Sequence, residues 1–93
     1  MSSHQLQNNS ELYDYLLRLS GELKSKGQIE AAEEVQVASR FAAGSSSEFF
    51  AEAQKALTQV KAQCGSVLNS SQLMSITSAI EQIEVAFEKI GGA

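Results

Sequence analysis

The sequence predicts an all-α protein, an antiparallel up-down four-helix bundle with short loops. Three observations carry this prediction. Apolar residues recur three and four residues apart in four segments, a spacing that places them on one face of a helix. Each predicted helix has a basic residue in its last turn and a glycine after it, which suits the negative end of a helix dipole and the turn beyond it. No segment shows strand-like alternation, and the 93 residues include no proline.

The first predicted helix covers about residues 11–26. The leucines of its apolar stripe are Leu12, Leu16, Leu19 and Leu23. Ser10 is the predicted N-cap, because its hydroxyl can accept an unpaired backbone N–H. Gly21 costs about 1 kcal/mol relative to alanine inside a helix, so we expect a bend or a close backbone approach there. Gly27 ends the helix, since a residue without Cβ can adopt the left-handed conformation.

The second predicted helix covers about residues 29–43 and ends at Gly44. Its buried face is rich in small residues, which lets a neighbouring helix come near: Ala31, Val35, Ala38 and Ala42, flanked by Phe41. Ser45 and Glu48 match the capping box that begins a helix, so the third helix is expected at about residues 48–64. Its stripe consists of Phe49, Phe50, Ala53, Ala56, Leu57, Val60 and Cys64, and Gly65 follows it.

The fourth helix is predicted to follow a loop over residues 65–71, with Ser70 or Ser71 as its N-cap. Its apolar residues are Leu73, Ile76, Ile80, Ile83, Phe87 and Ile90, which alternate three and four residues apart. Short loops make sequential helices antiparallel neighbours, so residues 10–93 are expected to form a single bundle domain after a mobile tail over residues 1–9. The predicted core anchors are Leu12, Leu16, Leu19, Leu23, Phe41, Phe50, Leu57, Val60, Leu73, Ile76, Ile80, Ile83 and Phe87.

Composition and charge exclude several function classes. Seven Lys/Arg against eleven Asp/Glu give a net charge of −4, and the basic residues are scattered, so nucleic acid is not an expected partner. No apolar run is long enough for a membrane span, and the polar N-terminus lacks the apolar centre of a secretory signal, so we expect a cytoplasmic protein. One His in the tail, His4, and one Cys rule out a zinc finger or a disulfide framework.

No catalytic, metal or cofactor site is predicted. Cys64 lies on an apolar stripe with no histidine to activate it, so we interpret it as a buried structural residue. Two groups of acidic residues are interpreted as solvated helix faces. The first consists of Glu30, Glu33 and Glu34, and the second of Glu81, Glu84 and Glu88. We therefore expect a non-enzymatic protein.

Function is predicted from the apolar side chains that lie outside the predicted core stripes. These candidate partner-binding residues are Tyr13, Leu17, Val37, Met74 and Val85. They suggest a protein–protein interaction module that binds another protein, or a second copy of itself, through an apolar helix face. The alternative is a ligand-binding or regulatory bundle that holds a small apolar molecule between its helices.

Overall fold

The computed structural model describes residues 9–91, and of Asn9 and residues 89–91 it describes only the backbone. The helices are α1 (Asn9–Ser25), α2 (Ile29–Arg40), the 3₁₀ turn η1 (Phe41–Ala43), α3 (Ser46–Cys64) and α4 (Ser70–Gly91). The predicted all-α fold of four helices is confirmed. The predicted tail overlaps α1 at Asn9, while its remaining residues, His4 among them, lie outside the described residues.

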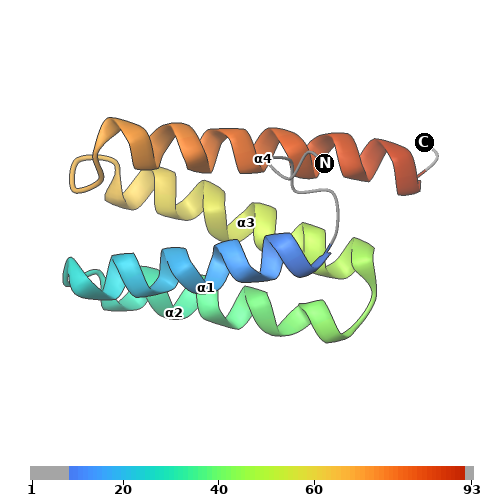
Figure 1. Ribbon diagram of the computed structural model, residues 1–93, viewed down its shortest axis with the longest axis horizontal. Helices are drawn as coiled ribbons and strands as arrows, with labels where there is room; N and C mark the ends of the chain where they lie inside the picture. Colours follow the sequence, from blue (N-terminus) through green and yellow to red (C-terminus); the bar gives the residue numbers. More distant parts are fainter. Residues whose placement is uncertain (1–8, 92–93) are drawn as a thin grey trace.

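The helices lie roughly along the long axis of a body with extents of 38 × 25 × 24 Å (Figure 1). The α1–α2 and α3–α4 turns share one end, and the α2–α3 connection lies at the other. The closest helix pairs are consecutive ones: α1 with α2, α2 with α3, and α3 with α4. In the described chain, the backbones of α1 and α4 approach each other less closely than any of these pairs. The up-down arrangement therefore has a wider separation between its first and last helices.

The end of α1 is a Schellman motif. The N–H of Gln28 donates to the carbonyl of Leu23 at 2.9 Å, and the N–H of Gly27 donates to that of Lys24 at 3.0 Å. Gly27 has a φ of 81°, so the predicted left-handed glycine is confirmed. At the other end, Ser10 lies within α1, so its prediction as the N-cap is wrong.

The α2–α3 connection differs from the prediction by a few residues. Helix α2 ends at Arg40, and the three residues assigned to its last turn form η1 instead, where the chain tightens before Gly44. The cap at Ser45 is confirmed, because its hydroxyl accepts the backbone N–H of Glu48 at 3.2 Å. Because the cap directly precedes the helix, α3 begins at Ser46, two residues earlier than predicted.

The start of α4 corrects the predicted cap. Asn69 caps this helix, not Ser70 or Ser71: its side-chain oxygen accepts the N–H of Gln72 at 2.8 Å. In return, the Gln72 side chain accepts the N–H of Asn69 at 3.1 Å. This reciprocal pair is a capping box with Asn and Gln in its two roles, and it places both serines inside the helix.

Two other glycines have a different local role from Gly27. Gly65 ends α3 as predicted, with a right-handed φ of −59°, and the Lys61 carbonyl would lie 3.0 Å from an added Cβ. Gly21 has no atom within 4 Å of an added Cβ, so no close backbone approach explains it. Of the described glycines, only Gly27 has a positive φ.

The core is built from the predicted stripes, with differences at their edges. The four leucines of the α1 stripe are all buried, as are Leu57, Val60, Ile76 and Ile83. Phe49 is fully buried and belongs among the anchors, whereas Phe41 is only half-buried against the core. Leu73, Ile80 and Phe87 are also half-buried, because α4 packs chiefly on α3 and leaves one flank of its stripe less covered. The side chain of Ile90 lies outside the described residues.

Candidate protein-binding surfaces

The five apolar residues predicted to bind a partner are all exposed. Their exposed fractions are 38% for Tyr13, 39% for Leu17, 48% for Val37, 71% for Met74 and 50% for Val85. The structure does not bring them together on one surface. Tyr13 and Leu17 lie on α1, Val37 lies on α2, and the other two lie on α4.

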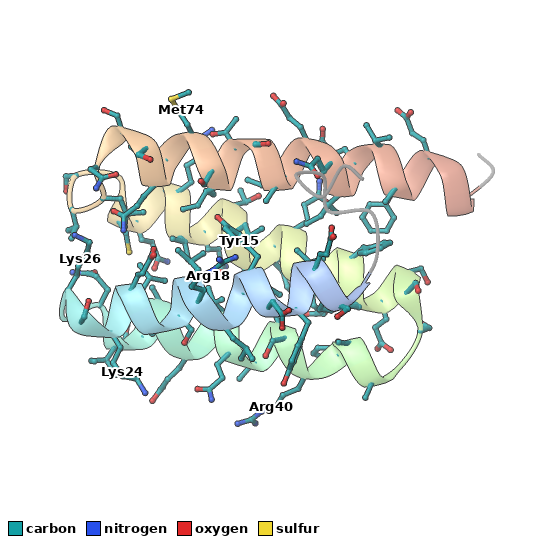
Figure 2. All side chains as sticks on the ribbon, in the orientation of Figure 1. Tyr15, Arg18, Lys24, Lys26, Arg40 and Met74 are labelled. Atoms are coloured by element: carbon teal, nitrogen blue, oxygen red, sulfur yellow. The ribbon has the colours of Figure 1, made fainter. Side chains whose placement is uncertain are left out.

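The α4 pair lies on the outer side of its helix. Met74 points away from the other helices in Figure 2. Eleven residues separate it from Val85, or about 16 Å along a helix axis, and the exposed residues between them include Ser78 and Glu81. Two isolated apolar side chains of this kind are normal on a protein surface. This pair is therefore the weaker candidate.

Tyr13 lines a shallow depression between α1 and the end of α2. The depression has a volume of about 550 Å³ and is lined by Ser10, Tyr13, Ser39, Arg40, Ala42 and Ala43. The Arg40 guanidinium is its one charged group, and Figure 2 shows this side chain extending away from the helices. Small residues and a single cation give this depression little that selects a particular partner.

Val37 lies in a second concave surface of similar volume, which we call the α2–α3 groove. It is lined by Glu30, Glu33, Glu34, Val37, Ala38, Glu52, Lys55, Ala56 and Gln59, and its volume is about 540 Å³. Ala38 and Ala56 are buried and form its floor, while Val37 is half-exposed between them and the solvent. The small floor residues let the two helix backbones come close, which leaves the longer flanking side chains as walls.

The α2–α3 groove is acidic overall, and the excess of negative charge lies on its α2 wall. Four glutamates line the groove, against the single ammonium of Lys55. That ammonium lies 3.5 Å from a carboxylate oxygen of Glu52, one turn earlier on α3. The pair is exposed and contributes little to stability, but it places the one cation next to an anion. The groove thus combines an apolar floor with a negative rim.

A third pocket, the α1–α4 cleft, is small and polar. It has a volume of about 290 Å³ and is lined by Tyr15, Arg18, Leu19, Glu22, Ser71, Gln72 and Ser75. The amide of Gln72 donates to Glu22 at 3.2 Å and thereby links α4 to α1. Tyr15, labelled in Figure 2, has a buried hydroxyl with no hydrogen-bond partner within the described chain. Burial, and secondly the Glu22 carboxylate, raise the pKa of Tyr15 to about 12, while Arg18 opposes the shift.

Cys64 is buried, as predicted, with 1% of its surface exposed. Its Sγ lies 3.5 Å from the side-chain oxygen of Gln28. Burial raises the pKa of this thiol, and the nearby carboxylate of Glu34 adds to the shift. Both effects disfavour the thiolate, which is the reactive form, so the arrangement suits a packed side chain better than a nucleophile.

Metal and membrane sites can also be assessed for the described residues. Among residues 9–91, no three His, Cys, Asp or Glu side chains are placed to hold a metal ion together. The described helices also include none with the length and apolar character needed to cross a bilayer.

Comparisons with protein-family models, with curated proteins and with solved structures found no match to this chain. The function of the protein is therefore inferred from its surfaces.

The residues that the sequence analysis missed are those of α3 in the groove. Glu52, Lys55 and Gln59 stand three and four residues apart, which marks one flank of α3. On α2, Glu33 and Val37 share a flank by the same spacing. These signals identify each flank, but nothing in the spacing shows that the two flanks face each other across a groove.

Proposed function

We propose that this protein is a non-enzymatic helical module that binds another protein, and that the α2–α3 groove is its binding surface. The observation that carries the proposal is the place of Val37. A valine that is 48% exposed stands over a floor of buried alanines, in a concavity of about 540 Å³. Concave apolar surfaces with a few polar groups at the edge are preferred sites of recognition. The proposal includes a cytoplasmic location, which suits the single unpaired cysteine.

The groove is a better candidate than the other surfaces on physical grounds. It offers an exposed apolar side chain within a concavity, whereas Met74 and Val85 stand apart along α4, and it has more charged groups than the depression at Tyr13. A partner side chain that covers Val37 removes apolar surface from water. Full burial of a valine is worth about 1.5–3 kcal/mol, and because Val37 is 48% exposed, covering it is worth about half of that, roughly 0.7–1.5 kcal/mol. That corresponds to roughly three- to tenfold in affinity.

The test uses the matched valines Val37 and Val85, which are 48% and 50% exposed. A photo-crosslinking amino acid is placed at either position in the native host, and the crosslinked protein is identified and purified. Its affinity is then measured by calorimetry for the unaltered chain and for the Val37→Ser and Val85→Ser variants. We expect crosslinks at position 37, binding weakened roughly three- to tenfold by Val37→Ser, and a change below about twofold for Val85→Ser.

Three outcomes contradict the proposal. Equal crosslinking at both positions, or equal loss of affinity in both variants, shows that the groove is not the binding surface. If the only crosslinks are to a second copy of the chain, the groove forms a homodimer interface and does not bind another protein. Far-ultraviolet circular dichroism of each variant controls for loss of the helical fold.

A further inference from the structure

We propose that the segment bound in the α2–α3 groove is a basic amphipathic helix, with an apolar side chain over Val37 and Lys or Arg residues along the edge that faces α2. This inference rests on the proposed function and adds the chemistry of the partner. It follows from the combination of an apolar floor with an acidic α2 wall in one concave surface, since Glu52 on the α3 wall already has a cation beside it.

The charge in the groove is a large part of the charge of the whole protein. Four glutamates and one lysine line the groove, which leaves a formal charge of −3, while the complete chain has −4. Glu30, Glu33 and Glu34 come from α2, and Glu52 comes from α3. The carboxylates on the α2 wall repel one another, and a cationic segment beside them removes that repulsion.

Helix stability accounts for only part of this acidic set. Glu30 lies in the first turn of α2, where a carboxylate interacts favourably with the helix dipole. Glu33 and Glu34 lie in the next turn, beyond the range over which that effect is strong. Glu52 has a partner in Lys55, but the pair leaves the groove strongly negative. The excess of carboxylates over cations is thus available to an external partner.

The length of the groove corresponds to about two turns of a helix. On α2 the lining runs from Glu30 to Ala38, and on α3 it runs from Glu52 to Gln59, which is about 10–12 Å on each wall. A helix laid along such a groove contacts it with side chains three, four and seven residues apart. Its central apolar residue covers Val37, while basic residues on the flank that faces α2 reach the carboxylates and keep their aliphatic stems on the floor.

The experiment uses three fluorescent helical peptides that share one leucine stripe. Their flanking positions are all Lys, all Gln or all Glu, and binding to the complete protein is followed by fluorescence anisotropy. We expect the Lys peptide to bind at least about tenfold more tightly than the Gln peptide, and the Glu peptide more weakly than both. Raising the salt concentration from about 0.05 M to about 0.5 M should weaken the Lys peptide most.

Matched charge variants separate the groove from non-specific attraction. The double variant Glu33→Lys with Glu52→Lys changes the groove, and Glu81→Lys with Glu88→Lys makes the same change in net charge on exposed positions of α4. We expect the groove variant to weaken the Lys peptide at least about tenfold and to favour the Glu peptide. The α4 variant should change either affinity by less than about threefold. Circular dichroism confirms that both variants fold.

The results that overturn the basic-helix proposal are distinct from those that overturn the proposed function. If the Gln peptide binds as tightly as the Lys peptide, or if both double variants weaken binding equally, the charge argument is wrong. Absence of binding by the Lys peptide also rejects it. The crosslinking at Val37 decides the proposed function separately, since it does not depend on the charge of the partner.

Discussion

Replacing Tyr15 with phenylalanine should stabilise the protein. The ring packs against the core, but its hydroxyl is buried without a hydrogen-bond partner in the described chain. A buried polar group left without a partner costs about 1–3 kcal/mol, and the substitution removes the hydroxyl while keeping the ring. We therefore expect the free energy of unfolding to rise by about 1 kcal/mol near neutral pH.

The same substitution should change the response to alkaline pH. The pKa of Tyr15 rises from an ordinary value of 10 to about 12 in the folded state, because burial and Glu22 disfavour the phenolate. Between these values the folded state retains a proton that the unfolded state has lost, so stability falls as the pH rises. Two pH units correspond to a loss of at most about 3 kcal/mol, which solvent screening reduces and which is complete only above the folded pKa. The Tyr15→Phe variant should not show this loss of stability at alkaline pH.

The assay is urea unfolding followed by circular dichroism, from about pH 7 to about pH 11. Tyr13→Phe is the matched control, because Tyr13 is 38% exposed and should show neither effect. Tyrosinate absorbance of the two single variants identifies which hydroxyl titrates late, since the chain has no tryptophan. If Tyr15→Phe lowers stability at neutral pH, or if its alkaline decline matches that of the unaltered protein, the assignment of a buried, unpartnered hydroxyl is wrong.

Three further predictions concern the core, the glycines and a cap. Leu57→Ala should lower the free energy of unfolding by about 2–5 kcal/mol, because Leu57 is fully buried, whereas Leu17→Ala should change it by less than about 0.5 kcal/mol. Equal melting temperatures for the two variants would contradict the assignment of Leu57 to the core. Gly21→Ala should stabilise the protein by about 1 kcal/mol, since the added Cβ meets open space, whereas Gly27→Ala should destabilise it by about 1–2 kcal/mol because its φ is 81°. If chemical denaturation shows that both substitutions change the free energy of unfolding in the same direction, this explanation is wrong. Asn69→Ala should cost about 0.5–2 kcal/mol in the same measurement, and a neutral result would mean that Asn69 does not cap α4.

The central residues of each helix were predictable because burial there depends on helical periodicity. Leu12, Leu16, Leu19 and Leu23 lie on one face of any regular helix, and that face must cover a core. The helix ends were less predictable, because several residues can cap at the same place. Near α4, Asn69, Ser70 and Ser71 are all suitable caps, and the Gln72 side chain selects Asn69 by completing the reciprocal pair.

The candidate site was predictable only in part. The sequence marks Val37 as an apolar residue outside the main stripe, but it does not show Glu52 or Lys55 as its neighbours. Whether two helix flanks form a groove depends on how closely their helices pack and at what angle. Those quantities are set by side chains at the contact, here Ala38 and Ala56, and not by the period of either helix.

The sequence alone determined that the chain folds into four helices, which face of each covers the core and that Gly27 turns the chain, because these follow from local spacing and backbone freedom. Only the tertiary structure decided that α1 and α4 stand further apart than consecutive helices, that the Tyr15 hydroxyl is buried without a partner, and that the acidic flanks of α2 and α3 enclose Val37. The physical reason is that the edge of a helix is covered or exposed according to its neighbours, and neighbours far apart in the chain are chosen by the packing of the whole core.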